Sequence, residues 1–259
     1  MKFIVKLFPE ITIKSRPVRK RMIQRLQSNL HNILKRSSED IKVQGHWDKV
    51  DVVCAGNDAE KRELIIDVLQ RTPGVQYFIE VKEHALGDFE NVFQLTKEAY
   101  ADRIKGKTFK VRVKRSGQHD FKSPELERYV GGGLREHTEA AGVDVRNPEV
   151  WVDLEVKGET LFIVQGTFQG LGGYPLGSQQ EVVSLISGGF DSVVASYMTM
   201  RRGCKTHFLF FNLGGAAHEI GVKQVALYLW QKFGSSARVK FITIPFDEVV
   251  GEILQSVHH

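Results

Sequence analysis

The stretch Ser187-Gly188-Gly189-Phe190-Asp191-Ser192 contains residue types that can bind a phosphate group. An apolar run at 182–186 precedes it and predicts a short buried strand, whereas 192–200 predicts a helix. Glycines between a strand and a helix let a phosphate approach backbone N–H groups at the positive end of the helix dipole. The two serines add hydroxyl donors, so this stretch predicts an anion site.

Asp191 places a carboxylate within the predicted anion site. A carboxylate repels phosphate unless a cation lies between them, so we expect Asp191 to bind Mg²⁺ through the phosphates. Asp191 and Ser192 are also residue types that cap the first turn of a helix. The alternative is an ordinary glycine-rich connection. The stretch is not a Walker A motif, and Gly106-Lys107-Thr108 has Ala101 where that motif needs its first glycine.

The first 82 residues show the order strand, helix, two strands, helix, strand, which predicts a ferredoxin-like domain at 1–82. The expected elements are 2–8, 17–35, 41–47, 49–54, 58–70 and 75–82. Basic residues are concentrated here and have no acidic residue among them: Lys14, Arg16, Arg19, Lys20, Arg21 and Arg25. Such a cluster indicates a surface that contacts the phosphates of a nucleic acid, the alternative being a solvated helix face.

A second domain is expected at 83–166, with the order helix, strand, helix and two strands. The expected elements are 88–104, 108–115, 124–141, 150–156 and 160–166. In the first strand Phe109, Val111 and Val113 alternate with Lys110, Arg112 and Lys114, so the cations share one face. With Arg115 they form a second candidate phosphate-contacting surface. Three glycines at 131–133 lie inside a predicted helix and need compensation, either from close helix packing or from approach of an RNA backbone.

Glycines and a proline concentrate at 170–178, and we expect a linker at 167–180. Beyond it, the predicted strands 206–211 and 239–244 alternate with helices, of which one is expected at 220–233. Alternation with apolar strands predicts a parallel, doubly wound sheet over 181–259 that lacks its full set of strands. The overall fold class is therefore α/β and α+β in several domains. The loop 212–218 follows a strand at the same sheet edge and is a further candidate for ligand contacts.

The 259 residues have a net charge of +5, and 42% of them are hydrophobic, as in ordinary globular proteins. No apolar run reaches the roughly 18 residues of a membrane span, and no signal peptide is evident, so we expect a cytoplasmic protein with no membrane partner. Cys54 and Cys204 match no metal-binding spacing and are expected to be reduced thiols.

Two segments resemble known families. Ser187 to Ser192 resembles the PP-loop, S-G-G-x-D-S, of the ATP pyrophosphatases, which implies ATP cleaved between its α and β phosphates. The stretches 109–115 and 127–134 resemble the THUMP domain, an RNA-binding module of tRNA-modifying enzymes.

The order ferredoxin-like, THUMP and PP-loop, with the blocks 2–11 and 211–219, resembles the 4-thiouridine synthetase family of tRNA sulfurtransferases. The resemblance implies that tRNA is gripped by the THUMP side, that ATP adenylates uridine 8 at its C4 oxygen, and that sulfur from a persulfide displaces AMP. It implies that Asp191 is the essential catalytic residue. It assigns contacts with the nucleotide and its phosphates to Leu185, Ile186, Ser187, Gly188, Gly189, Phe190 and Ser192.

The resemblance implies as partners tRNA, a cysteine desulfurase as sulfur donor and a thiamine sulfur-carrier protein. Neither Cys54 nor Cys204 occupies the position of a sulfur-carrying cysteine of the family, so we interpret the chain as a fragment that does not complete thiolation alone. Two alternatives are a module that only binds tRNA and a PP-loop enzyme that amidates or ligates.

Overall fold

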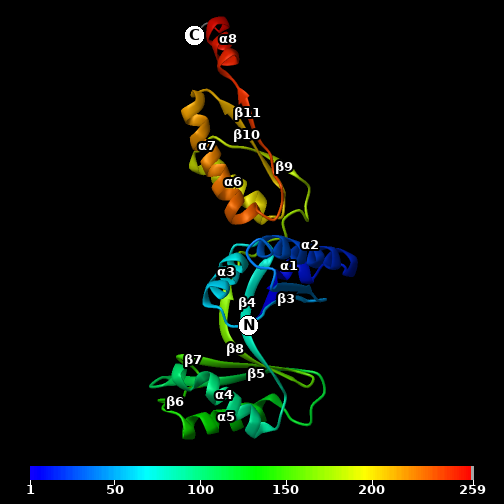
Figure 1. Ribbon diagram of the computed structural model, residues 1–259, viewed down its shortest axis with the longest axis vertical. Helices are drawn as coiled ribbons and strands as arrows, with labels where there is room; N and C mark the ends of the chain where they lie inside the picture. Colours follow the sequence, from blue (N-terminus) through cyan, green and yellow to red (C-terminus); the bar gives the residue numbers. More distant parts are fainter. Residues whose placement is uncertain (258–259) are drawn as a thin grey trace. The chain divides into compact units, whose positions relative to one another are not determined.

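The computed structural model of the chain describes residues 1–257 (Figure 1). It contains two compact units, one formed by 1–3 and 79–167, the other by 4–78 and 168–259. Strands β4 (Val75–Ala85) and β8 (Thr160–Gln169) run through the boundaries between them. No helix in the described part of the chain combines the length and the apolarity needed to cross a membrane.

The ferredoxin-like part has the predicted alternation and adds a short helix that the sequence did not indicate. Its elements are β1 (Lys2–Leu7), α1 (Pro9–Thr12), α2 (Arg16–Leu34), β2 (Ile41–Gly45), β3 (Lys49–Cys54), α3 (Ala59–Gln70) and β4. The strand order β2-β3-β1-β4 is that of the split βαβ arrangement, with β2 and β3 antiparallel. The apolar face of α2, including Leu26, Leu30 and Leu34, is buried. The predicted ferredoxin-like fold is thus confirmed.

The other unit contains the predicted helices and strands and one additional two-residue strand. Its further elements are α4 (Phe89–Ile104), β5 (Thr108–Ser116), α5 (Ser123–His137), β6 (Gly142–Val143), β7 (Val150–Lys157) and β8. Strand β5 pairs in parallel with β6 and β7, and β7 pairs antiparallel with β8. Figure 1 shows α4 and α5 on one face of these strands, where they cover the core around Phe109, Val130 and Leu154.

Helix α5 ends at His137, four residues before the expected boundary. The backbone beyond it pairs with the α4–β5 connection, since Gly106 N–H donates to Glu139 O and Ala141 N–H donates to Lys107 O. These tertiary hydrogen bonds replace the bonds that another helical turn would have made. The expectation of a helix to 141 was therefore wrong at its end.

The remaining elements form a three-stranded parallel sheet with helices. They are β9 (Val182–Leu185), α6 (Phe190–Arg201), β10 (Thr206–Asn212), α7 (Gly215–Leu229), a π-helix η1 (Trp230–Gly234), β11 (Phe241–Pro245) and α8 (Asp247–Ser256). The strand order is β11-β10-β9, with both pairings parallel, as predicted. Helices α6 and α7 pack on β9 and β10 around Phe208, Phe210 and Val222. Helix α7 begins at Gly215, five residues earlier than expected.

Candidate functional site

The loop between β9 and α6 is closed by hydrogen bonds between its two serines. Ser187 N–H donates to the Ser192 hydroxyl at 3.2 Å, and that hydroxyl donates to Gly189 O at 2.9 Å. The two hydroxyl oxygens lie 3.2 Å apart. Below the loop, the hydroxyls of Ser184 and Ser196 are 2.8 Å apart and tie the strand to the helix. The serines therefore set the shape of the loop from both ends.

Gly188 adopts a backbone conformation that only glycine takes readily, with φ of +84°. A Cβ atom placed there would lie 3.3 Å from Val222 Cγ2 of α7. Gly189, in contrast, has an ordinary extended conformation and is the N-cap of α6. The tight turn at Gly188 brings the loop backbone directly in front of the helix N-terminus.

Asp191 lies in the first turn of α6, and its side chain is exposed. Because Gly189 is the N-cap, the expectation that Asp191 caps this helix is not met, and no hydrogen bond to its carboxylate is present among residues 1–257. The first-turn N–H groups of Phe190, Asp191 and Ser192 have no acceptor within the helix. A free carboxylate next to free N–H groups suits a phosphate accompanied by a cation.

The apolar residues assigned to this site point in different directions. Ile186 is 3% exposed and belongs to the core beneath α6 and α7, and its N–H donates to Leu209 O at 2.9 Å, so neither its side chain nor its N–H is open to a ligand. Leu185 and Phe190 are 60% and 91% exposed. Because successive strand residues alternate between faces, Leu185 lies on the sheet face opposite the helices. The structure thus keeps the two serines, Gly188 and Asp191 together, whereas the side chains of Leu185 and Ile186 diverge.

The loop after β10 begins at the same sheet edge as the loop after β9, because these strands are parallel. Here Glu219 accepts hydrogen bonds from Thr243 and Asn212. Hydrogen bonds from Lys223 and Thr243 hold the pKa of Glu219 below its ordinary value, which keeps the carboxylate charged. Glu219 lies in the block 211–219 that resembles the family, but no sequence motif singled out its carboxylate.

The cations of α2 and the segment before it are free of acidic partners. Among the described residues, no carboxylate forms an ion pair with Lys14, Arg16, Arg19 or Arg21. Lys14 Nζ lies 6.0 Å from the ring centre of Tyr174, and the Arg19 guanidinium lies 3.9 Å from that of Trp47. Their positive charge is therefore available to a polyanion.

The cations of β5 face a neighbouring strand that carries acids. In the parallel register of β5 and β7, Lys110 stands beside Trp151, Arg112 beside Asp153 and Lys114 beside Glu155. Arg112 forms hydrogen bonds with both Asp153 carboxylate oxygens, and Lys114 Nζ lies 3.8 Å from Glu155. The structure places the three cations on one face as expected and also supplies neutralising partners for two of them.

Arg115 lies at the end of the same strand and extends this surface. Its guanidinium is 3.2 Å from His119 Nδ1, while His119 Nε2 lies 2.9 Å from Gly158 O. The ring of Phe121 lies 5.8 Å from the guanidinium carbon of Arg115. These contacts orient Arg115 without an acidic partner.

Three family models match consecutive parts of the chain. The ThiI ferredoxin-like domain matches residues 2–78, the THUMP domain matches 87–164, and the thiamine biosynthesis protein (ThiI) family matches 177–259. The chain is similar to the tRNA sulfurtransferase of Pectobacterium carotovorum subsp. carotovorum (strain PC1), with 55% identity over 257 residues. It is 54% identical to the tRNA sulfurtransferase of Escherichia coli O1:K1 / APEC. Each alignment covers 99% of this chain and 53% of the relative.

Two solved structures have a similar fold. One is a 4-thiouridine synthetase–RNA complex with bound ATP, which has a TM-score of 0.82 and 23% identity and is matched over 99% of this chain and 65% of that one. The other is a protein from Pyrococcus horikoshii Ot3, with a TM-score of 0.79 and 18% identity over 98% of this chain and 82% of that one. The chain spans about half the length of the curated relatives. These matches confirm the resemblance inferred from the motifs: the chain carries, in order, the ferredoxin-like, THUMP and ThiI segments of the tRNA sulfurtransferase family.

Proposed function

We propose that the chain is part of an ATP-dependent tRNA sulfurtransferase that replaces the C4 oxygen of uridine 8 with sulfur. The observation that carries this proposal is the Ser187–Ser192 loop, in which internal serine hydrogen bonds leave the carboxylate of Asp191 unengaged. The relatives that share more than half of its residues are named tRNA sulfurtransferases. A loop suited to phosphates and two basic surfaces in one chain fit a reaction in which the adenylyl group of ATP is transferred to a nucleic acid and pyrophosphate is released.

The residues of the loop fit the phosphates of ATP. The N–H groups at the start of α6 and the glycine turn at Gly188 would hold the phosphates, and Asp191 would hold Mg²⁺ against them. ATP supplies the adenylyl group that makes the uridine oxygen a good leaving group. The residues of this chain would bind and orient the nucleotide. Ser187 and Ser192 hold the loop backbone in place, and Asp191 keeps a negative charge where the cation is needed.

The unpaired cations of α2 and the surface of β5 would contact the tRNA phosphates. Among residues 1–257, Lys14, Arg16, Arg19 and Arg21 have no acidic partner to displace, whereas Arg112 and Lys114 do. We propose a cysteine desulfurase as the source of the persulfide sulfur, a thiamine sulfur-carrier protein as a second acceptor, and the cytoplasm as the location. The relatives' family name, thiamine biosynthesis protein, supports the second acceptor.

The replacement Asp191→Asn tests this function, in a protein that contains this chain together with the further length of its relatives. Asn keeps the size of the side chain but removes the charge that would hold the cation. Pyrophosphate release is expected to fall roughly a hundredfold, about 2.7 kcal/mol of barrier, while tRNA affinity stays nearly unchanged. Stability is also expected to stay unchanged, because Asp191 makes no capping hydrogen bond.

The control is Glu60→Gln, which removes an acidic side chain from the first turn of α3. It is expected to release pyrophosphate at the unmodified rate. A near-normal rate in Asp191→Asn removes Asp191 from the site. Binding of tRNA without any ATP binding by the unmodified protein would instead support a module that only binds tRNA.

A further inference from the structure

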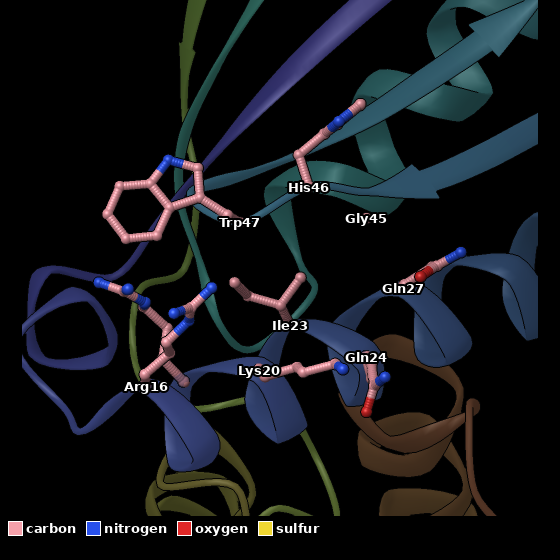
Figure 2. A pocket seen from close by; sticks show the side chains of 9 residues that line it. Arg16, Lys20, Ile23, Gln24, Gln27, Gly45, His46 and Trp47 are labelled. Atoms are coloured by element: carbon pink, nitrogen blue, oxygen red, sulfur yellow. The ribbon is translucent and has the colours of Figure 1, made fainter.

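A groove lies between helix α2 and the turn that joins β2 to β3 (Figure 2). Its volume is about 690 Å³, and both of its walls belong to the ferredoxin-like part. Helix α2 contributes Arg16, Arg19, Lys20 and Gln24, and the turn contributes His46 and Trp47. The groove thus combines cations, an amide and an aromatic ring within one domain.

Trp47 is an exposed aromatic side chain held in a defined position. It is 67% exposed, although burying an indole ring away from water is energetically favourable. The guanidinium of Arg19 lies 3.9 Å from its ring centre, and Arg19 itself donates a hydrogen bond of 3.1 Å to Thr12 O. The guanidinium of Arg19 therefore covers one face of the indole and holds the ring in place, while the rest of the ring surface is open to a ligand.

The turn that carries Trp47 is anchored from beneath. His46 N–H donates to Lys49 O at 2.8 Å, and the buried Lys49 and Asp51 side chains form a hydrogen bond of 3.0 Å. His46 Nε2 lies 3.3 Å from the Asp51 carboxylate. At Gly45 the backbone approaches α2 so closely that a Cβ atom would lie 2.7 Å from Gln27 Oε1. These contacts fix the distance between Trp47 and the helix.

The charges that border the groove are positive and not neutralised. Within residues 1–257, neither Arg16 nor Lys20 forms an ion pair, and Figure 2 shows both on the helix wall opposite the turn. A polyanion can use them without displacing a carboxylate. The side chain of Ile23 in the groove is 4% exposed, so the base of the groove is apolar.

We propose that this groove binds an unpaired nucleotide of RNA, with its base stacked on the face of Trp47 that Arg19 leaves open and its phosphates beside Arg16 and Lys20. Stacking on an exposed aromatic ring requires a base whose face is free, and bases inside a duplex have both faces covered by their neighbours. The groove therefore selects a single-stranded segment, while the unpaired cations of α2 provide the attraction common to all RNA. This inference rests on the RNA-binding part of the proposed function and adds a specific subsite to it.

The test compares Trp47→Ala with Trp47→Phe in the 259-residue chain, using a short unstructured RNA oligonucleotide and an RNA duplex without unpaired ends. Trp47→Ala is expected to weaken binding of the single-stranded oligonucleotide roughly tenfold, which is within the range for loss of one base–aromatic stack, and Trp47→Phe to weaken it less. Duplex affinity is expected to stay the same for both variants. Quenching of tryptophan fluorescence by the oligonucleotide is expected to be smaller in Trp47→Phe than in the unmodified chain, and the remaining quenching is expected from Trp151, which lies beside Lys110 on β5.

Unchanged single-strand affinity in Trp47→Ala overturns the subsite and leaves the proposed function in place. An equal loss for single-stranded and duplex RNA also overturns it, because the effect would then lie in the charged surface. An acidic peptide that displaces the oligonucleotide from the unmodified chain but not from Trp47→Ala would show that the groove binds a protein partner instead. Failure of the unmodified chain to bind either RNA counts against the proposed function itself. Tyr228→Ala, which removes an exposed aromatic side chain of α7 outside both basic surfaces, serves as the control for loss of one aromatic ring.

Discussion

The guanidinium of Arg112 forms a two-pronged ion pair with Asp153, with nitrogen–oxygen distances of 2.6 and 2.8 Å. The two residues are neighbours because β5 and β7 pair in parallel in that register. An RNA phosphate that approaches Arg112 must therefore compete with a carboxylate. In the described part of the chain, no carboxylate competes in this way for the cations of α2.

This difference predicts unequal salt dependence of tRNA binding. Asp153→Asn is expected to raise affinity and to steepen the plot of log affinity against log salt by up to about 0.9 units, as one more cation becomes available. Arg21→Ala is expected to flatten the plot by about 0.7 to 0.9 units, and Arg112→Ala by less. A tRNA titration at several salt concentrations measures all three slopes. Equal effects of Arg21→Ala and Arg112→Ala would show that the ion pair does not limit Arg112.

Gly188 and Gly189 form a matched pair for testing whether the β9–α6 loop is the proposed nucleotide site. Gly188→Ala places a side chain at a φ of +84° and 3.3 Å from Val222 Cγ2, which is expected to distort the loop at a cost of roughly 1–2 kcal/mol. ATP affinity, measured by calorimetry, is expected to fall for Gly188→Ala and to change less for Gly189→Ala, whose φ is −75°. Equal losses in both variants would mean that the turn at Gly188 is not what shapes the site.

Two glycines of α5 separate helix packing from RNA contact. A Cβ atom at Gly133 would lie 2.7 Å from the ring of the buried Phe93, whereas one at Gly132 would meet nothing within 4 Å. Gly133→Ala is expected to destabilise the chain by about 1–2 kcal/mol, since overpacking costs more than the gain in helix propensity. Gly132→Ala is expected to stabilise it by about 0.5–1 kcal/mol.

Urea unfolding of the two glycine variants measures these free energies. Close packing thus explains why position 133 is a glycine. At position 132 the other explanation, close approach of an RNA backbone, stays open. If Gly132→Ala stabilises the chain and also weakens RNA binding, the RNA backbone approaches at that position. Stabilisation without any change in RNA affinity would leave Gly132 with no role in binding.

Two arginines of the ferredoxin-like part bind backbone carbonyls near the end of η1. Arg36 donates to Ser235 O at 2.7 Å, and Arg71 donates to Gln231 O and Lys232 O at 2.9 and 3.0 Å. Positive groups at this end complement the helix dipole and satisfy carbonyls that lack helical partners. The double replacement Arg36→Ala, Arg71→Ala is expected to lower the free energy of unfolding by about 2–4 kcal/mol.

Thermal and denaturant unfolding followed by far-UV circular dichroism check this expectation. Arg128→Ala, which removes an exposed arginine without such contacts, is the control and is expected to stay within about 0.5 kcal/mol of the unmodified chain. An equal effect of the control and of the double variant would mean that the carbonyl contacts add nothing to stability.

The sequence by itself determined the local features of this protein. The apolar strand before Ser187, the helix after Gly189 and the alternation of Phe109, Val111 and Val113 each depend on residues close together in the chain. Hydrophobic period and turn chemistry are properties of such short windows, so the order of elements and the strand–glycine turn–helix arrangement at 182–200 could be predicted from them.

Only the tertiary structure decided which residues from distant segments meet. The pairing of Arg112 with Asp153 depends on strand register, which is set by backbone hydrogen bonds between segments that are about 40 residues apart. The stacking of Arg19 on Trp47 depends on how a turn packs against a helix, and the early end of α5 depends on bonds to the α4–β5 connection. Charge alone predicted two similar basic surfaces, whereas the register of β5 and β7 neutralised part of the one on β5.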